Sequence, residues 1–312
     1  MSSEDRVACP SCGAINVRLS GTIPASNAFA GRHLDRMLSG GALWRCPACH
    51  LAFRYPRLSK QELDTLYRQG HDESWPDPVE NRIDCVLAAK HIAAFPKVKR
   101  VLDVGCFDGK LLDYLDSGYE KLGVEIHREA AKRAEKRGIR INAQDFEELA
   151  SHPAVADAVL AMDVIEHTDD PLAFLAQLAQ AASPGGLVIV ATGNTDASSW
   201  RFMGSRYWYC HIAEHISFIN PAWAHRAAHH LGLDVVAIQT FSHVDSRGKW
   251  GRRLREMIVN LAYRASPWMF ARLRQLGAGG IDVVRFPELL EVPPYWLTAQ
   301  DHILVVFKKN EA

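Results

Sequence analysis

Short apolar runs alternate with amphipathic stretches through the middle of the chain. Six of the runs predict β-strands, and a stretch with helical spacing of apolar residues separates each from the next: 100–105, 120–125, 139–142, 157–162, 187–192 and 233–240. Such alternation is typical of parallel strands covered by helices on both faces of the sheet. We therefore predict an α/β fold, with one more strand at 301–307.

The strand at 100–105 leads directly into a glycine-rich turn, from Gly105 to Gly109. A buried strand that feeds a tight turn allows the backbone to come close to a ligand. About twenty residues later, as in nucleotide-type sites, the second strand ends at Glu125. An acid at this place is the usual partner of a ribose diol. The two features together predict a cofactor with an adenosine end.

The turn lacks the glycine spacing of a dinucleotide site. Its order is Asp103-x-Gly105-x-x-x-Gly109, with Phe107 where a middle glycine would stand. The carboxylate of Asp103 would repel a diphosphate, but it suits an ammonium group. S-adenosylmethionine carries an ammonium, a sulfonium and a ribose without any phosphate, so the residues favour it over NAD.

Five pieces of the chain, in this order, resemble the class I S-adenosylmethionine-dependent methyltransferases: 101–112, 123–125, 144–146, 161–171 and 184–186. The resemblance implies a Rossmann-like seven-stranded sheet, whose last strand pairs antiparallel with 233–240. It also implies that the cofactor binds at the carboxyl ends of the strands. The expected cofactor-binding residues are Asp103, Gly105, Cys106, Gly109, Glu125, Asp145, Phe146 and Asp163.

Two C-x-x-C pairs, Cys9 with Cys12 and Cys46 with Cys49, stand near the front of the sequence. Two cysteines at i and i+3 in a tight turn can offer both thiolates to one ion, and two such turns complete a tetrahedral zinc site. A site closed by four thiolates leaves no position for a substrate, so we expect a structural Zn²⁺. The alternative is two unrelated redox or structural pairs.

The segments 49–57 and 59–67 resemble the zinc-ribbon front of a methyltransferase subgroup common in bacterial glycan and sugar pathways, although His50 stands where that subgroup commonly has a glycine. Ser59 and Glu62 form a capping-box pattern, which predicts the start of a helix. A break at 75–78 separates it from a second helix. The expected organisation is a zinc lobe (1–58), a helical linker (59–95), a cofactor-binding core (96–241), a helical insertion (242–299) and the last strand (300–312).

The insertion is basic between 247 and 274, where Glu256 is the only acid. Its cations are Arg247, Lys249, Arg252, Arg253, Arg255, Arg264, Arg272 and Arg274. Apolar and aromatic residues recur among them at helical spacing. The pattern suits a helical cap over the substrate cleft, or an interfacial helix that makes peripheral contact with an anionic membrane. The two roles are compatible, and both stay open.

The methyl acceptor is expected beyond the fourth and fifth strands, where 206–218 is dense in aromatic and imidazole side chains. The resembling subgroup commonly has a Glu-His pair here, which some sugar methyltransferases use for base chemistry. Carried over, the pair is Glu214 and His215. An imidazole titrates near neutral pH, so His215 could take a hydroxyl proton, with Glu214 or Tyr207 orienting it or binding the sugar. Alternatively, His215 only ties its loop to the sheet.

Other histidines are weaker candidates. His211 is an alternative base, and His167, in the family's Glu-His motif after the fourth strand, more often shapes the cofactor pocket than takes the proton. His225 and His229 have the i and i+4 spacing of a metal pair, but a solvated or capping role is expected for them.

The composition is that of an ordinary globular protein, with 48% hydrophobic and 23% charged residues over 312. The formal net charge is zero, so we expect no nucleic-acid partner. Neither a signal peptide nor a membrane-spanning run is visible, and seven cysteines then favour reduced thiols in a cytoplasmic setting. The oligomeric state stays open.

We therefore expect an S-adenosylmethionine-dependent methyltransferase that acts on a hydroxyl of a sugar or glycan, in a lipid-linked form or free. Sugar C-methyltransferases with the same front usually carry a long further domain behind the core, and its absence here favours O-methylation. One alternative acceptor is a lipid-like or quinone-like small molecule. Another alternative is a non-catalytic zinc-ribbon scaffold with a vestigial cofactor site.

Overall fold

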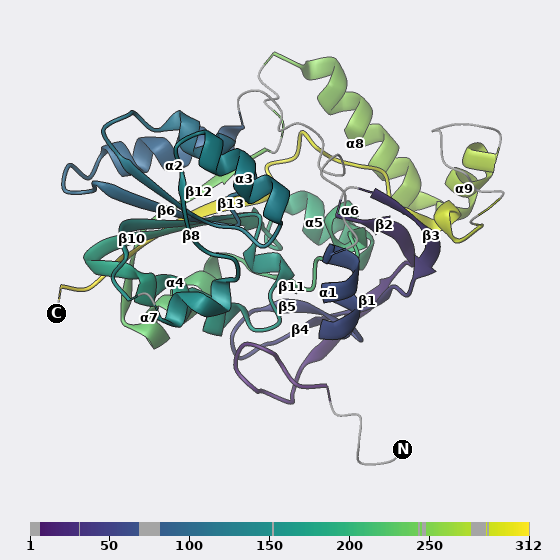
Figure 1. Ribbon diagram of the computed structural model, residues 1–312. Coiled ribbons are helices and arrows are strands. Elements are labelled where there is room, and N and C mark those ends of the chain that lie inside the picture. The colour runs from purple at the N-terminus through teal and green to yellow at the C-terminus, as the bar shows by residue number, and fades with distance from the viewer. Residues whose placement is uncertain are drawn as a thin grey trace.

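The computed structural model describes residues 7–30, 32–68, 82–151, 153–242, 244, 248–275, 285 and 287–311. Its centre is a seven-stranded sheet in the order β12-β13-β10-β9-β6-β7-β8 (Figure 1). The strands are β6 (Arg100–Val104), β7 (Glu120–Val124), β8 (Arg140–Ala143), β9 (Ala156–Met162), β10 (Ala182–Gly193), β12 (Leu233–Phe241) and β13 (His302–Lys309). All seven predicted strands are present. β13 runs antiparallel to both β10 and β12, and the other pairs are parallel, which confirms the predicted fold.

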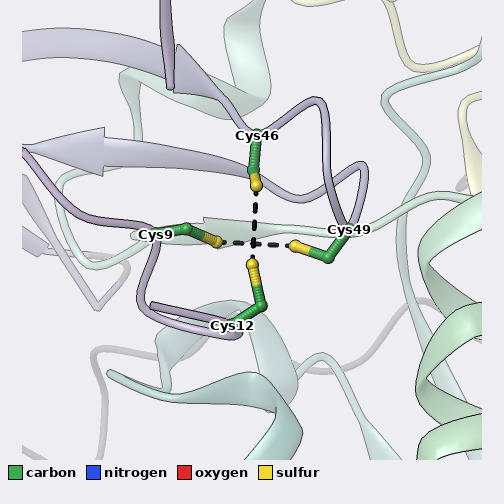
Figure 2. A group of neighbouring side chains, drawn as sticks. All are labelled: Cys9, Cys12, Cys46 and Cys49. Atoms are coloured by element: carbon green, nitrogen blue, oxygen red, sulfur yellow. Dashed lines mark hydrogen bonds between the residues drawn. The ribbon is translucent and has the colours of Figure 1, made fainter. Parts of the chain in front are cut away.

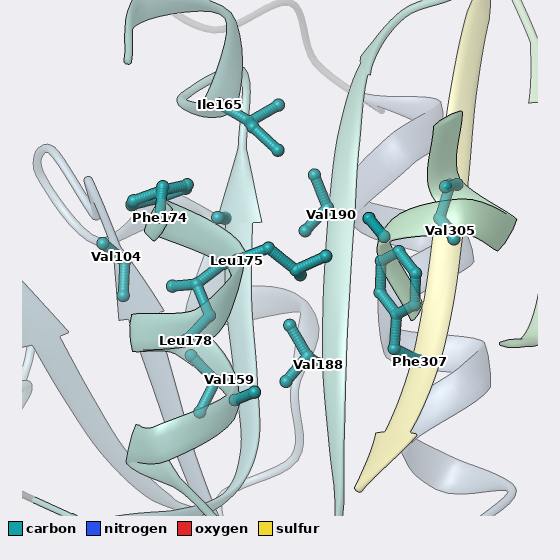
Figure 3. Close-up of a cluster of buried hydrophobic side chains, with 14 of the residues drawn as sticks. Val104, Val159, Ile165, Phe174, Leu175, Leu178, Val188, Val190, Val305 and Phe307 are labelled. Carbon is teal, nitrogen blue, oxygen red and sulfur yellow. The ribbon is translucent and has the colours of Figure 1, made fainter. Parts of the chain in front are cut away.

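Two apolar layers cover the sheet, because successive strand residues point to opposite faces. On one face, α4 (Pro171–Ala181) packs on β9 and β10 at Val159 and Val188 (Figure 3), and α7 (Pro221–Leu231) packs on β12. On the other face, α2 (Ile83–Ala93) and α3 (Arg128–Lys136) cover the alternate residues of the same strands. The central strands are therefore buried on both faces, which explains their continuous apolar runs.

Three strands of the front lobe share a sheet with a strand from the core of the chain. β1 (Arg18–Ile23), β4 (Gly41–Arg45) and β5 (Ala52–Tyr55) pair in that order, and β11 (Ser217–Phe218) completes the sheet against β5. A hairpin of β2 (Ser26–Phe29) and β3 (Arg32–Leu38) lies beside them. The expected lobe at 1–58 is thus joined to the core by strand pairing between residues far apart in the chain.

The expected linker contains α1 (Lys60–Arg68) and α2, while the predicted break at 75–78 lies outside the described residues. The capping box is confirmed, because Ser59 N donates to Glu62 Oε2 (3.0 Å) and Glu62 N donates to Ser59 Oγ (3.3 Å). The predicted turn at 184–186 is part of β10, where the register with β9 shifts between Ala182 and Leu187. Short helical segments complete the core: η2 (Lys110–Tyr114), η3 (Phe146–Ser151), η4 (Ile165–His167), α5 (Ser198–Met203), η5 (Gly204–Arg206) and α6 (Trp208–His211).

The insertion forms α8 (Trp250–Ala265), α9 (Pro267–Gln275) and η6 (Pro287–Glu291), at the outer end of the molecule next to β2 and β3 (Figure 1). Arg247 and the side chain of Arg274 lie outside the described residues. Within the part of the chain that is described, no helix has the length and apolar content needed to cross a bilayer.

Candidate active site

The glycine turn lies at the carboxyl ends of β6 and β7. The amides of Gly105 and Cys106 both donate to the carbonyl of Val124, at 2.9 and 3.1 Å, which fixes the turn to the neighbouring strand. Gly105 has φ +78°, and a Cβ there would lie 2.8 Å from Val164 Cγ2. Glycine is therefore required at this position by conformation and by the close approach of the segment after β9.

Phe107 adopts φ +48°, a left-handed conformation that glycine favours. The backbone of the turn thus keeps the shape that a middle glycine would give, at a cost of roughly 1–2 kcal/mol. The ring lies against the guanidinium of Arg133 on α3, 5.4 Å from ring centroid to Cζ. The ring of Phe107 is therefore in contact with α3.

Asp103 is the last residue but one of β6, and its side chain is 2% exposed. None of the described residues donates a hydrogen bond to its carboxylate. Burial raises the pKa of Asp103 to about 8, and the nearby guanidinium of Arg82 opposes that rise. A buried carboxyl without a hydrogen-bond donor is costly, and a bound cationic group such as an ammonium would supply a donor.

Glu125, directly after β7, accepts hydrogen bonds from the amides of Phe107 and His127, both at 2.7 Å. Its pKa is nevertheless raised, because burial outweighs those two bonds. Each carboxylate oxygen has a further lone pair, so Glu125 could also accept from a ribose hydroxyl. These two carboxyls could serve the two parts of S-adenosylmethionine that were expected here, Asp103 the ammonium and Glu125 the ribose.

Arg82 is a site residue that sequence reasoning missed. Its guanidinium lies 2.7 Å from Asp163 Oδ2 after β9, and it also contacts Asp84 at the start of α2. Asp163 itself has φ +55°. An arginine beside a predicted helix start carries no signal in the sequence, because its acid partner is far away in the chain. In the fold it balances the negative charge at the carboxyl edge.

The remaining expected cofactor residues differ in their placement. Cys106 is buried, and its sulfur lies over Gly123, where a Cβ would be 2.6 Å from Sγ, so only its backbone belongs to the turn. A Cβ on Gly109 would lie 2.0 Å from Ile139 Cδ1, so Gly109 is needed for packing. Asp145 is half-buried just before η3, and the side chain of Phe146 lies outside the described residues.

A buried polar cluster stands next to this edge, where η4 meets the loop before β11. A carboxylate oxygen of Glu166 and a ring nitrogen each of His167 and His215 lie within 4.8 Å of one another, and the two imidazole rings are 4.9 Å apart. His167 and His215 are 48 residues apart in the sequence, and the fold brings them together. The three groups could share a proton or hold a single cation.

Hydrogen bonds to carbonyl oxygens, which can only accept, determine which ring nitrogens of these histidines carry protons. His215 Nδ1 donates to the carbonyl of Tyr209 (3.1 Å), and His167 Nδ1 donates to that of Glu214 (3.2 Å). Burial lowers the pKa of both histidines, so both are neutral near pH 7. His215 then has a lone pair on Nε2 that can accept a proton, although burial makes it a weaker base than an exposed imidazole.

Two glutamates and a tyrosine lie around the histidines. The Tyr209 hydroxyl donates to Glu166 Oε1, and burial raises the pKa of Glu166 to about 7. Glu214 Oε1 accepts from the amide of Ala30 (2.7 Å). Among the described residues, no donor reaches Oε2 of either glutamate. The cluster is thus only partly satisfied, which is a frequent property of functional sites.

Tyr207, expected to orient His215 or bind the sugar, makes its hydrogen bonds elsewhere than to His215. Its hydroxyl donates to Asp301 Oδ2 (2.5 Å), away from His215. The ring of Tyr209 lies 4.2 Å from that of His215, in the position expected for Tyr207. The sequence alone does not distinguish the two tyrosines, because the segment is rich in aromatic residues. His211 is bound to the carbonyl of Ala25 (3.1 Å), outside the cluster.

His225 and His229 are exposed on α7. Among the described residues, they are not part of any group of potential metal ligands.

The four cysteines of the front converge on one point (Figure 2). Cys9 Sγ lies 3.5 Å from Cys49 Sγ, and Cys12 Sγ lies 3.6 Å from Cys46 Sγ. A tetrahedron with Zn–S bonds of about 2.3 Å has sulfur–sulfur edges of roughly 3.8 Å. The four side chains could therefore hold one ion with small adjustments. The knuckles pack on α7, where Trp223 Nε1 donates to Ser11 Oγ (3.0 Å).

A seven-stranded sheet with one antiparallel strand, a glycine turn and acids at its carboxyl edge defines a Rossmann-like fold for a nucleoside-type cofactor. The chain belongs to the methyltransferase domain family, whose model matches residues 79–238. This confirms the predicted methyltransferase at the level of the family.

Two similar curated proteins are ubiquinone biosynthesis O-methyltransferases. That of Nitrosospira multiformis is 31% identical over 159 residues, which are 46% of this chain and 66% of that protein. That of Thiobacillus denitrificans is 30% identical over 152 residues, which are 44% of this chain and 65% of that protein. The alignments thus span just under two thirds of these relatives. A solved SAM dependent methyltransferase from Archaeoglobus fulgidus has 18% identity and a TM-score of 0.48, with 80% of this chain and 100% of that chain covered.

Proposed function

We propose that the protein transfers a methyl group from S-adenosylmethionine to a hydroxyl of a small-molecule acceptor. The observation that carries the proposal is the buried carboxyl of Asp103, without a donor, beside Glu125 and the glycine turn. Asp103 would bind the ammonium and Glu125 the ribose. The backbone of the turn at Gly105 would lie against the part of the cofactor between them. When bound, the cofactor supplies an electrophilic methyl on a sulfonium.

The protein's own contribution to the reaction would be alignment and proton removal. In this proposal, Nε2 of His215 takes the proton of the acceptor hydroxyl. The imidazolium that forms would have the carboxyl of Glu166 in the same cluster. His167 is a second possible acceptor of that proton, since its ring is in contact with that of His215.

Two classes of acceptor are compatible with this chemistry. The resemblance of the front to glycan and sugar methyltransferases favours a sugar hydroxyl. The name of the two curated relatives favours a quinone-like phenol, and their alignments cover 46% and 44% of this chain. A phenol ionises with a pKa of about 10, far below that of an alcohol, so it depends less on a base. We retain the sugar hydroxyl as the proposal and the phenol as its alternative.

We also propose that Cys9, Cys12, Cys46 and Cys49 bind a structural Zn²⁺. All four ligand positions would be thiolates, which leaves no site for a substrate. The ion would stabilise the front lobe against α7 and would have no part in methyl transfer.

Turnover with isotope-labelled S-adenosylmethionine tests the function. The protein is incubated with sugar, glycan and lipid extracts and with a dihydroxy-quinol, and the product masses are measured. A labelled sugar supports the proposal, and a labelled quinol supports its alternative. Absence of micromolar cofactor binding in calorimetry would contradict both and favour a scaffold. A chelator added to the zinc-loaded protein distinguishes two mechanisms: a His215 base, or a catalytic cation held by Glu166, His167 and His215. Only an enzyme that depends on such a cation would lose turnover at once.

A further inference from the structure

The apolar stripe of α8 faces solvent. Trp250, Leu254, Met257, Ile258 and Leu261 follow one another at i, i+4, i+7, i+8 and i+11, which places them on one side of the helix. All five are exposed, from 40% for Met257 to 76% for Trp250. On α9, Trp268 and Met269 are exposed as well, at 68% and 54%. These seven residues are called the outer apolar surface below.

The inner side of α8 is held by polar contacts and by the ring of Tyr263, which packs in a buried apolar cluster. Asn260 is fully buried and donates to the carbonyls of Glu256 (2.9 Å) and Tyr295 (3.4 Å). The Tyr263 hydroxyl donates to the carbonyl of Glu291 (2.6 Å), and Glu256 Oε2 accepts from the amide and hydroxyl of Thr298. A helix at the surface of a globular protein normally shows the opposite orientation, with its apolar side inward. These hydrogen bonds therefore hold α8 in a position that directs its apolar side outward.

Arginines flank the outer apolar surface. The guanidinium of Arg253 lies over the ring of Trp250 at 5.5 Å, and that of Arg272 lies over the ring of Trp268 at 4.9 Å. The only acid of α8, Glu256, is on its inner side. Exposed aromatic and aliphatic side chains between arginines are what an interfacial helix presents to a membrane with anionic lipids.

We propose that α8 and α9 dock the protein onto an anionic lipid surface, with the outer apolar surface in the interfacial region of the bilayer and Arg253 and Arg272 at the lipid phosphates. A second copy of the chain fits less well, because a symmetric contact would bring together two surfaces that both carry arginines. Apolar patches of this kind are uncommon on proteins without a partner. The proposal is independent of the methyl acceptor.

Flotation with lipid vesicles tests this docking. The full chain is mixed with vesicles of phosphatidylglycerol and phosphatidylcholine in equal parts, or of phosphatidylcholine alone. We expect binding to the anionic vesicles that weakens with salt, and at least about tenfold less binding for Leu254→Gln/Ile258→Gln. Leu19→Gln is the control, since Leu19 on β1 is as exposed (59%) but outside the surface. Arg253→Gln/Arg272→Gln should lose most of the preference for anionic lipid.

Tryptophan fluorescence gives a second readout, because Trp250 and Trp268 would move from water into the interface. We expect a blue shift on addition of anionic vesicles that is reduced in Trp250→Phe/Trp268→Phe. Circular dichroism confirms that each variant is folded. The proposal is overturned if the native chain does not float with anionic vesicles, if Leu254→Gln/Ile258→Gln floats equally well, or if that variant instead abolishes a dimer present without lipid.

Discussion

The guanidinium of Arg82 lies 2.7 Å from Oδ2 of Asp163, and this ion pair connects the start of α2 with the end of β9. The same guanidinium contacts Asp84 and lowers the pKa of the buried Asp103 against the effect of burial. One cation thus compensates three acids at the edge where the cofactor is proposed to bind.

Arg82→Ala should destabilise the protein, because it leaves three neighbouring carboxyls without their cation. We expect a loss of about 1–3 kcal/mol in the free energy of unfolding, less than for a fully buried pair since Arg82 is partly exposed. Urea denaturation at pH 7.5 measures it. Arg201→Ala removes the more exposed pair with Asp196 and should cost less than about 1 kcal/mol. Equal losses for the two variants would contradict the role given to Arg82.

The affinity for S-adenosylmethionine should depend on the protonation of Asp103. The pKa of Asp103 is raised to about 8, so its carboxyl is neutral below that pH in the free protein. Binding of an ammonium requires the carboxylate and therefore releases a proton. We expect affinity to fall by up to about tenfold per pH unit from pH 8 to pH 6, as measured by calorimetry. Asp103→Asn should bind more weakly at pH 8 and lose most of this dependence; an unchanged pH profile would rule out the assignment.

His215→Ala should retain cofactor affinity and lose turnover. Removal of a general base typically costs about 10²–10⁴ in kcat. Labelled-cofactor turnover and calorimetry on the same preparation measure the two quantities. His211→Ala is the matched control, since His211 stands outside the cluster and is bound to the carbonyl of Ala25. A parallel loss of affinity and turnover would make His215 a structural residue that ties its loop to Tyr209.

Cys12→Ser should release the zinc ion and destabilise the front lobe. The site would lose one of four thiolates, and metal binding contributes directly to folding in such sites. We expect the metal content to fall from about one ion per chain to a small fraction, with a lower unfolding midpoint. Elemental analysis and denaturant titration measure both. Cys85→Ser, at a buried thiol outside the group of four, should keep its metal. Metal-free native protein would contradict the zinc assignment.

His50→Gly should stabilise the protein. His50 has φ +66° and an exposed side chain, so glycine removes strain without loss of packing. We expect a gain of about 0.5–1 kcal/mol in the free energy of unfolding, measured with urea. The same change at His33, an exposed residue within β3, should destabilise by a similar amount, because glycine weakens strand interiors. A loss at His50 would show that its side chain has an interaction that matters.

Short-range patterns in the sequence predicted much of the fold correctly. All seven strands of the central sheet, the antiparallel last strand and the capping box of Ser59 with Glu62 were predicted from patterns within a few residues or from the resemblance. Phe107 and His50 stand where the motifs that they resemble lead one to expect glycine, and both adopt positive φ. The backbone shape of the motif is therefore retained even where the residue departs from it.

Long-range contacts could not be predicted in the same way. Arg82 meets Asp163 across 81 positions, and β11 contributes only two residues to the front sheet. Neither has a periodic signal. The base candidates illustrate the same limit, since Tyr207 and Tyr209 are two positions apart, yet their hydroxyls donate to Asp301 and Glu166. Which of them meets His215 depends on how α6 is oriented, and composition does not specify that.

The pairing of β5 with β11 has a consequence for biosynthesis. The ribosome releases the first three strands of the front sheet long before Ser217 and Phe218, which close its edge, have been translated. Until then β5 presents unpaired backbone groups, a template for association with other nascent chains. Early binding of a metal by the four thiols would order this segment while the rest of the chain is still being synthesised. The cysteine knuckles would then reduce aggregation of the nascent chain, in addition to stabilising the folded protein.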